Sequence, residues 1–462
     1  MNNLEFILER FSSLAWGTHL LVLLLGGGLF FMLYSRFLPF RYFGHAINVL
    51  RGKYDDPDDP GEISHFEALS SALAATVGMG NIGGVAVAIS MGGPGALFWM
   101  WISAFVGMAT KFFTCTLAIM YRGKDSSGQI QGGPMYVIEE GLGKKWKPLA
   151  IFFCIAGLFG PLPAFNANQL IQIVRDVVLI PNGVIDAPTF ASNLIAGLLL
   201  ASIVALVIFG GIQRIAQVAS RLVPMMVVVY VVSVLYIIFS NSEQIIPCFA
   251  LIFEDAFTGN AVLGGAVGSI IVVGAKRAAF SNEAGIGTAP MAHGAAKTNE
   301  PVREGLVAML GPAIDTLVVC TMTALAILIT DVWRTTDADG VTLTVNAFNS
   351  AIPYDLGGYL LIVSVLCFSL SSLFTLSYYG TKCFSYLVGA HRAHYFNYFY
   401  IFVIIVSSVA SLTAVINLVD GMYALMAIPT MISALILAPK VKAAAKSYFS
   451  RVSPEEPKKA VQ

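Results

Sequence analysis

The 462-residue sequence has few charged residues and no excess of either sign. Asp, Glu, Lys and Arg make up 12% of the chain, and 27 basic residues balance 27 acidic ones. A chain without a basic excess gives no electrostatic reason to expect a nucleic-acid partner. Hydrophobic residues reach 57% and the mean hydropathy is +0.76. This is too apolar for an ordinary water-soluble core, so we expect an integral membrane protein that lies in a lipid bilayer.

The sequence also lacks the residue clusters of hydrolytic enzymes and of redox or metal centres. The six cysteines stand singly in apolar runs and form no C-x-x-C pair, so we interpret them as packing residues. The six histidines form no H-E-x-x-H motif, and no G-x-S-x-G motif occurs. We therefore expect no catalytic site.

Apolar runs long enough to cross a bilayer recur along the chain. A spanning helix needs roughly 20 mostly apolar residues. The sequence contains about eleven such runs, at 15–35, 66–91, 95–121, 149–178, 191–210, 217–239, 266–296, 304–330, 356–388, 395–416 and 418–438. We expect the polar segments between them to be loops.

The basic residues concentrate in alternate connecting segments. The segments near 180–190, 241–258 and 331–355 are rich in Asp and Glu and hold almost no basic residue beyond Arg334. Cytoplasmic segments of membrane proteins are enriched in Lys and Arg. The alternation predicts a multi-pass protein of the plasma (inner) membrane, with its N-terminus outside and its C-terminus in the cytoplasm.

Two of the apolar runs are interrupted by glycine at matching positions. When the first run is set aside, ten remain, and the first of each five, 66–91 and 266–296, carries the glycines. Each glycine inside a helix costs roughly 1 kcal/mol relative to alanine. Gly80 and Gly84 alone could form a G-x-x-x-G helix-packing face. Two matched interruptions instead favour a secondary transporter built from inverted repeats.

Interrupted helices at membrane depth expose main-chain groups that lipid cannot satisfy. The N-terminus of a half-helix attracts a carboxylate, whereas free carbonyls attract an ammonium group or a sodium ion. Ser371 and Ser372 would add hydroxyl oxygens for such an ion, although hydroxyls of this kind often bond to their own helix. The pattern indicates a site for a zwitterion, that is, an amino acid.

These segments resemble the alanine or glycine:cation symporter family, within the superfamily that shares the leucine-transporter fold. The resemblance rests on the motifs "ALAATVGMGNIGGVAVAISMGGPGALFWMW", "GGPMY", "GAKRAAFSNEAGIGTAPMAHGAAKT" and "SYYGTKCFSYL", and it runs from about Trp16 to Pro439. It implies an all-α integral membrane protein with about eleven transmembrane helices. These form a 5+5 inverted repeat of the leucine-transporter type, with one extra N-terminal helix and two discontinuous helices.

The resemblance also implies a division of the chain and an activity. We expect an N-terminal helix and cytoplasmic loop at 1–64, five-helix repeats at 65–240 and 258–440, and a cytoplasmic tail at 441–462. The implied activity is sodium-coupled import of a small neutral amino acid, alanine or glycine, by alternating access of a monomer, with Na+ as the coupling ion. Symport driven by protons and an ion channel stay open as alternatives. A channel would need a continuous pore lined by polar rings.

Site residues follow from the same resemblance. The sodium site is expected to use Ala74, Val77, Phe368, Ser371 and Ser372. The substrate carboxylate is expected at the N–H groups of Met79 and Gly80. The expected substrate site as a whole comprises Thr76, Gly78, Met79, Gly80, Asn81, Asn168, Gln169, Phe280, Ser281, Asn282, Ser372 and Leu376.

The sequence departs from the family pattern at two places. Leu376 stands where tryptophan is frequent, which would leave more room and make the larger substrate glutamine a candidate. The segment "PAFNANQLIQ" differs from a common Gly-Asn-x-x-Gln pattern. Asn168 is the better match to this pattern, and the glutamine role is open between Gln169 and Gln172.

Charged residues beside the second interruption suggest an ion-pair network. We expect Glu283 and Asp315 to neutralise Lys276 and Arg277, because an unpaired charge at membrane depth is costly.

Overall fold

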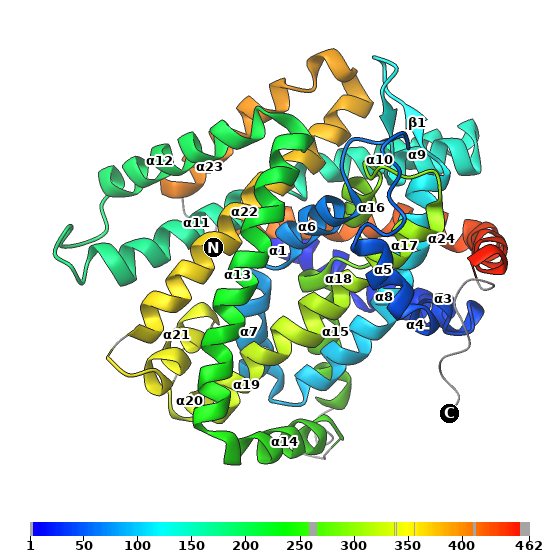
Figure 1. Ribbon diagram of the computed structural model, residues 1–462. Helices are drawn as coiled ribbons and strands as arrows, with labels where there is room; N and C mark the ends of the chain where they lie inside the picture. The colour runs from blue at the N-terminus through cyan, green and yellow to red at the C-terminus, as the bar shows by residue number, and fades with distance from the viewer. Residues whose placement is uncertain are drawn as a thin grey trace.

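The computed structural model describes residues 3–257, 266–336, 338, 340–354, 356–409 and 413–452. Within these ranges the protein is a bundle of helices (Figure 1), and its strands form one short hairpin, β1 (Gly123–Lys124) with β2 (Ile130–Gln131). The all-helical fold expected from the sequence is confirmed.

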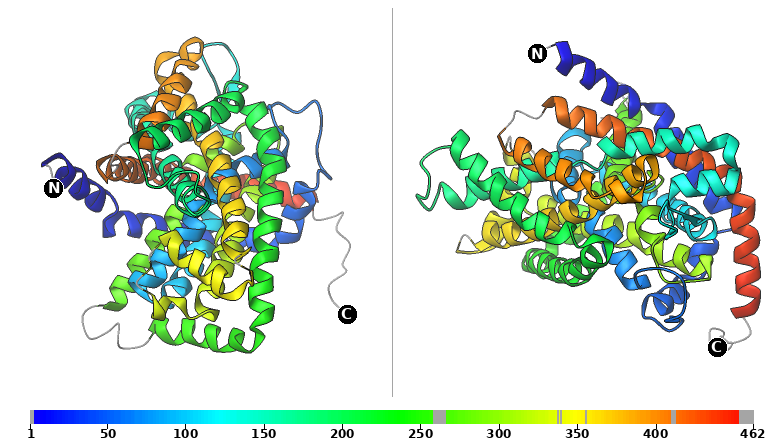
Figure 2. Two further views of the ribbon diagram at one scale, coloured as in Figure 1. Left: turned by 90° about the vertical axis from the view of Figure 1, so that its left-hand side faces the viewer. Right: turned by 90° about the horizontal axis from the view of Figure 1, so that it is seen from above.

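An N-terminal helix precedes the two interrupted helices. It consists of α1 (Asn3–Ala15), α2 (Thr18–Leu21), the π-helical turn η1 (Val22–Gly26) and α3 (Gly27–Tyr34). Both views in Figure 2 show α1 at the edge of the bundle, where it packs along α24 (Thr413–Val452). Two short helices, α4 (Leu38–Arg41) and α5 (Phe43–Leu50), follow.

The first half of the bundle begins with an interrupted helix, α6 (His65–Thr76) followed by η2 (Gly80–Gly84) and α7 (Val85–Gly92). The remaining elements of this half are α8 (Ala96–Met120), α9 (Pro134–Tyr136), η3 (Val137–Leu142), η4 (Lys144–Trp146), α10 (Lys147–Phe159), α11 (Ala164–Val174), η5 (Arg175–Leu179), α12 (Phe190–Ile208) and α13 (Gly211–Ser240). η6 (Ser242–Gln244) and α14 (Ile245–Phe257) lead to the second half.

The second half begins in the same way, with α15 (Ala266–Asn282) interrupted before α16 (Thr288–His293). It continues with α17 (Pro301–Ala308), α18 (Leu310–Pro312), η7 (Ala313–Cys320), α19 (Thr321–Ile329), α20 (Val332–Thr335), α21 (Gly340–Ala351), α22 (Leu356–Val388), η8 (Ala390–Arg392), α23 (Tyr395–Val409) and α24. The long helices α13 and α22 pack against each other, and both pack against α6 (Figure 1).

The number of membrane spans stays a prediction. Among the described residues, eight helices are long and apolar enough to cross a membrane, or nine when the bent pair α6 and α7 counts as one. The expected spans at 266–296 and 395–416 correspond to α15, with 17 residues, and α23, with 15. Both helices border residues outside the described part.

The first interruption lies where the sequence predicts it. A capping box starts α6, in which Ser64 Oγ accepts a hydrogen bond from the N–H of Glu67. The helix ends at Thr76, Val77 is extended with φ −73° and ψ 96°, and α6 and the segment 80–92 enclose a bend of 55°. Gly78 permits close packing here, because a Cβ on it would lie 2.9 Å from Ser372 Oγ.

The second interruption is also confirmed, and it is longer. After α15 ends at Asn282, the backbone has positive φ at Glu283 (54°), Gly285 (87°) and Gly287 (109°). Glycine adopts this left-handed region without the steric cost that a Cβ adds. The glycines therefore allow a non-helical turn between α15 and α16.

One feature of the expected organisation is refined and one is wrong. The run 149–178 lies within a single candidate membrane span, Lys144–Leu179, but residues 160–163 separate α10 from α11. Pro161 and Pro163 explain this interruption, because proline lacks the N–H that a helix needs. The segments 241–258 and 331–355 were expected as loops, but they contain α14 and α21.

These two helices pack against α7 and the residues that flank it in the first half. Asp255 of α14 accepts a hydrogen bond of 2.7 Å from the N–H of Gly95, in the turn after α7. Thr344 of α21 donates to the carbonyl oxygen of Ile82 in η2. Of the acidic residues that suggested loops, Glu254 and Asp255 thus belong to α14, whereas α21 itself contains no acidic residue.

Candidate functional site

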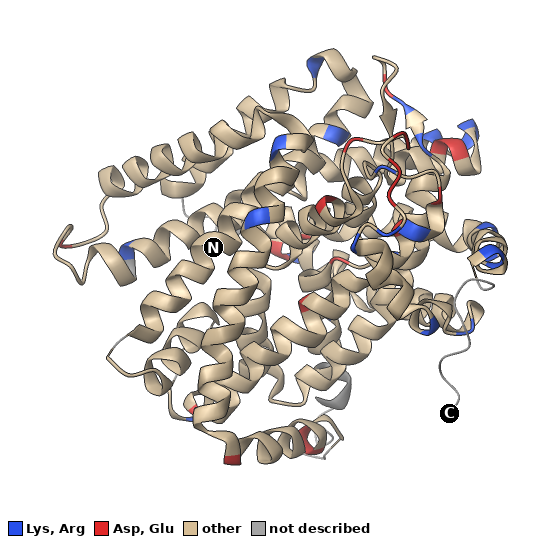
Figure 3. Cartoon of the chain, viewed as in Figure 1, with Lys and Arg blue, Asp and Glu red and all other residues tan. Residues whose placement is uncertain are grey.

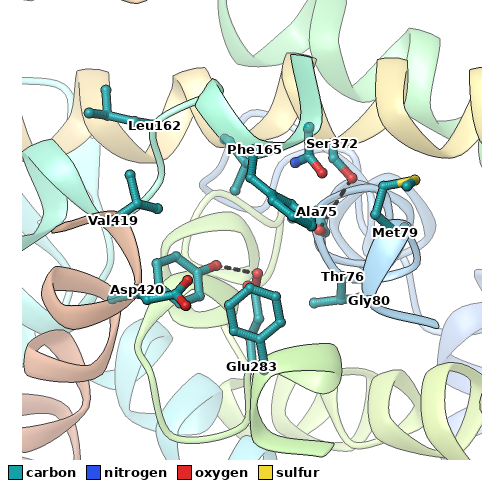
Figure 4. Close-up of a pocket in the computed structure, with 16 residues that line it drawn as sticks. Ala75, Thr76, Met79, Gly80, Leu162, Phe165, Glu283, Ser372, Val419 and Asp420 are labelled. Atoms are coloured by element: carbon teal, nitrogen blue, oxygen red, sulfur yellow. Dashed lines mark hydrogen bonds between the residues drawn. The ribbon is translucent and has the colours of Figure 1, made fainter. Parts of the chain in front are cut away.

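A small cavity lies where the two interrupted helices meet the break between α10 and α11, together with α22 and α24 (Figure 4). Its volume is about 70 Å³. Pockets for drug-sized ligands are roughly 300 Å³ or more, so this cavity suits a small ligand. It is lined by Ala75, Thr76, Gly78, Met79, Gly80, Gly160, Leu162, Phe165, Asn166, Phe280, Glu283, Ser372, Leu376, Val419, Asp420 and Tyr423.

More than half of the expected substrate residues line this cavity. They come from both interrupted helices and from α22, and they are Thr76, Gly78, Met79, Gly80, Phe280, Ser372 and Leu376. The cavity therefore brings together segments that are about 200 and 300 residues apart in the sequence.

Asn81, Ser281 and Asn282 do not line the cavity, because their side chains hold the interruptions together. Asn81 Oδ1 accepts from the N–H of Gly78 at 2.9 Å, and Asn81 Nδ2 donates to the Asp315 carboxylate at 2.7 Å. Ser281 Oγ donates to the same carboxylate at 2.8 Å. Asp315 thus links the two interruptions from behind the cavity.

Asn282 satisfies the backbone of its own interruption. Its Oδ1 accepts from the N–H of Ala284 at 3.0 Å, and its Nδ2 donates to Thr316 Oγ1 at 3.2 Å. Main-chain groups freed by an interruption at membrane depth need such protein partners.

On α11 the cavity is lined by Asn166, and Asn168 and Gln169 do not line it. Asn168 Nδ2 donates to the carbonyl oxygen of Ser407 on α23 at 3.2 Å. Gln169 Nε2 donates to the side-chain oxygens of Asn168 and Gln172 at 3.4 Å. Positions two apart in a helix point to roughly opposite sides, so Asn166 and Asn168 do not share a face.

Four of the expected sodium ligands form one cluster of neutral oxygens. Ser372 Oγ donates to the carbonyl oxygens of Ala74 and Phe368, each at 3.0 Å. Ser371 Oγ donates to the same two carbonyls, at 3.3 and 2.9 Å. Val77, the fifth, is buried and follows α6 directly. Oxygen ligands of this kind suit a hard cation.

The opposite wall of the cavity is acidic, and the expected substrate set did not include it. Glu283 accepts hydrogen bonds from Tyr423 Oη and Thr288 Oγ1, and Asp420 of α24 lines the cavity beside Tyr423. Figure 4 shows Glu283 and Asp420 on one side and Ala75 and Ser372 on the other. Asp420 could have been found as a lone acidic residue in an apolar run, since charges at membrane depth are usually functional.

The expected pairing of Glu283 and Asp315 with Lys276 and Arg277 is wrong. The buried cation that interacts electrostatically with Glu283 and Asp315 is Lys111, on α8. Lys276 and Arg277 interact with Asp420 instead, and Lys276 Nζ lies 5.8 Å from the centroid of the Trp16 ring. The reason is position along the bundle, because α8 packs against α15, and Gly107 and Thr110 of α8 lie beside Ala284 and Gly285 of the interruption.

The arrangement as a whole defines a class of membrane protein. Two discontinuous helices that meet at a polar cavity inside a helical bundle are typical of secondary transporters. The chain belongs to the sodium:alanine symporter family, whose model matches residues 1–461.

Individual relatives agree with this assignment. The sodium/alanine symporter AgcS of Methanococcus maripaludis is 40% identical over 464 residues, covering 98% of this chain and 99% of its own length. The probable sodium/glutamine symporter GlnT of Bacillus subtilis is 38% identical over 378 residues, covering 82% of this chain and 76% of its own length.

The fold also matches a solved structure. The crystal structure of MhsT in complex with L-phenylalanine aligns with a TM-score of 0.58 at 13% identity, covering 84% of this chain and 99% of that one. This match confirms the expected leucine-transporter type of fold.

Proposed function

We propose that the protein imports a small neutral amino acid together with sodium by alternating access. Family membership and the names of its relatives, a sodium/alanine symporter and a probable sodium/glutamine symporter, support the activity. One observation carries the proposal. Ser371 and Ser372 of α22 donate hydrogen bonds to the carbonyl oxygen of Ala74, close to the first interruption and beside the cavity.

We assign sodium to the oxygen cluster between α6 and α22. The ion would take the carbonyl oxygens of Ala74 and Phe368 and the two serine hydroxyls as ligands, with Val77 as a fifth contributor. Because the cluster joins α6 to α22, a sodium ion bound there would hold these two helices together.

We assign the amino acid to the adjacent cavity. Its carboxylate would bind near Met79 and Gly80, where the second half of the interrupted helix begins and its N–H groups point outward. Its ammonium group would face the acidic wall with Glu283, near Phe280. Asn166 takes the place that we expected for Asn168 or Gln169.

The sodium gradient is sufficient to drive uptake. Moving one positive charge through 100 mV yields about 2.3 kcal/mol, and a tenfold sodium gradient adds roughly 1.4 kcal/mol. The sum, about 3.7 kcal/mol, supports accumulation of several hundred-fold. A zwitterion carries no net charge, so symport with sodium would be electrogenic.

The charges favour the orientation that the sequence predicts. Figure 3 shows most Lys and Arg residues at the upper and right-hand side of the bundle, whereas the lower edge with α14 carries Asp and Glu. Cytoplasmic faces are enriched in basic residues. α6 begins at His65 and α16 ends at His293, and these two helix ends lie away from the cavity. We therefore place both at the cytoplasmic side of the plasma membrane.

Replacing one sodium ligand tests the proposal. In proteoliposomes, Ser372→Ala should raise the sodium concentration for half-maximal alanine uptake by about ten-fold or more, since a ligand to a cation is lost. The matched control is Ser377→Ala, because this buried hydroxyl donates within α22 to the carbonyl oxygen of Phe374. Equal sodium dependence of both variants would contradict the assigned site. Uptake driven by a pH gradient without sodium would favour the proton-driven alternative.

A further inference from the structure

The cytoplasmic ends of the two interrupted helices are fastened to each other. Glu304 at the start of α17 is fully buried, and its carboxylate contacts His65 of α6 and His293 of α16. The backbone adds a bridge between Ile63 and Ala296. Half-helices tied through a shared buried carboxylate and a backbone bridge should move as one unit.

An arginine from α8 strengthens this unit. Arg122, just beyond the end of α8, donates to the carbonyl oxygens of Pro60 and Gly294, both at 3.0 Å, and also to that of Ala296. Pro60 precedes α6, and the other two residues follow α16. One guanidinium group therefore holds the chain segments that flank both half-helices.

Helix α22 is joined to this unit at two depths. At the cavity, Ser372 Oγ donates to the carbonyl oxygen of Ala74 at 3.0 Å. Ten residues further along the helix, Lys382 Nζ donates to the carbonyl oxygen of Met291 in α16 at 3.1 Å. Ten helical residues correspond to about 15 Å, so the lysine contact lies between the cavity and the cytoplasmic side.

Lys382 is costly to keep in this position. Its side chain is only 5% exposed, and its second hydrogen bond goes to Tyr378 Oη, one turn earlier on α22, at 2.8 Å. Its ammonium group also interacts electrostatically with Glu62, which precedes α6. Buried charges inside membrane proteins usually serve a function. Here the ammonium group of Lys382 on α22 contacts the unit formed by α6 and α16.

We propose that Lys382 is the latch that keeps the cavity closed to the cytoplasm. Release of substrate requires α22 to separate from α16, which breaks the bond between Lys382 and the Met291 carbonyl. Because Glu304 and Arg122 tie α16 to α6, the same step pulls α6 away from the serine hydroxyls of α22. Loss of sodium and opening of the latch thus favour the same movement. This role rests on the proposed symport, and Lys382 acts as a positioning residue that does not touch the substrate.

Accessibility of the cavity from the cytoplasmic side tests the latch. A cysteine is introduced at Ala75, which lines the cavity, after the six native cysteines are replaced by alanine. Its labelling by a water-soluble maleimide is followed in inside-out vesicles. With Lys382→Met, labelling should become at least five-fold faster, roughly the effect of losing about 1 kcal/mol of closed-state stabilisation. The sodium concentration that protects against labelling should rise by a similar factor.

Two further variants separate a latch from a packing role. Thr381→Val is the matched control, because Thr381 Oγ1 bonds to Ser377 within α22 and to Asn397 on α23. It should label at the rate of the parent. Lys382→Arg keeps a charged donor and should restore most of the protection. If Lys382→Met does not fold, Tyr378→Phe, which removes the second partner of the ammonium group, should still speed labelling about two-fold.

The outcomes are distinct from those that test the proposed function. Labelling of Lys382→Met at the parent rate, in a protein whose parent takes up alanine with sodium, would overturn the latch alone. Labelling that is equally fast in the Met and Arg variants would also overturn it, because the donor would not matter. A parent protein without sodium-dependent uptake would instead contradict the proposed function.

Discussion

The two interrupted helices differ in the chemical groups at their interruptions. The first interruption, at 77–79, is short, contains no charged residue and faces the hydroxyl of Ser372. The second, at 283–287, is longer, has three residues with positive φ and carries the buried carboxylate of Glu283. The first therefore offers neutral main-chain groups, which suit sodium and a carboxylate, and the second offers negative charge, which suits an ammonium group.

The largest expected effect comes from adding a side chain at Gly78, where the first interruption packs closely against Ser372. Gly78→Ala places a Cβ 2.9 Å from Ser372 Oγ, so the serine must leave its position or the interruption must shift. We expect alanine uptake to fall by about 100-fold, in line with the effect of displacing a site by roughly 1 Å.

Gly84→Ala is the control for this change. Nothing lies within 4 Å of a Cβ at Gly84, and the residue is helical. Alanine should be tolerated there and should slightly stabilise the helix. Similar uptake by the two variants would show that the approach of Gly78 to Ser372 is unimportant.

Neutralising the second interruption should weaken substrate binding more than sodium binding. Glu283→Gln keeps the shape of the side chain and removes the charge that we assign to the substrate ammonium group. Loss of a charge-assisted hydrogen bond of about 1.5–3 kcal/mol predicts a KM for alanine that rises by roughly ten-fold or more. The half-maximal sodium concentration at saturating alanine should change far less. If the half-maximal sodium concentration changed more than the KM for alanine, Glu283 would serve sodium binding, and our assignment of the second interruption to the substrate would be contradicted.

Filling the cavity from α22 should sharpen selectivity without removing transport. Leu376 lines the cavity and is buried, so Leu376→Trp reduces the space for a substrate side chain. We expect competition by glutamine to weaken by about ten-fold relative to alanine, since overpacking typically costs 1–3 kcal/mol. A competition panel against sodium-driven alanine uptake measures this ratio, and an unchanged ratio would place the substrate side chain elsewhere.

The smallest effects compare two neighbouring asparagines of α11. Asn166→Ala should raise the KM by a few-fold, because Asn166 lines the cavity. Asn168→Ala should leave the KM unchanged and reduce stability by about 1 kcal/mol, because it loses the hydrogen bond to the Ser407 carbonyl. The opposite result, a KM effect at Asn168 alone, would restore the assignment expected from the sequence.

The sequence was sufficient where the signal is local. The positions of both interruptions follow from glycines that are unfavourable inside helices. The pairing of Ser371 and Ser372 with Ala74 of α6 was implied by the family resemblance of these motifs. The all-α membrane fold follows from composition and from the length of the apolar runs.

The sequence was insufficient where the answer depends on which helices are neighbours. The partners of Glu283 and Asp315 could not be assigned without knowing that α8 brings Lys111 to the interruptions. The choice between Asn166 and Asn168 depends on the helical phase after Pro163, which composition does not fix. The segments that contain α14 and α21 were expected as loops because they are rich in Asp and Glu. Asp255 of α14 in fact accepts a hydrogen bond from the turn after α7, and α21 itself contains no acidic residue.

The most direct test follows labelled alanine and labelled sodium together into proteoliposomes that contain the purified protein. An inward sodium gradient with a negative interior should drive alanine above its external concentration, and alanine should in turn accelerate sodium entry. Alanine accumulation that persists unchanged when sodium is replaced by potassium outside, at the same membrane potential, would contradict sodium-coupled symport by this protein.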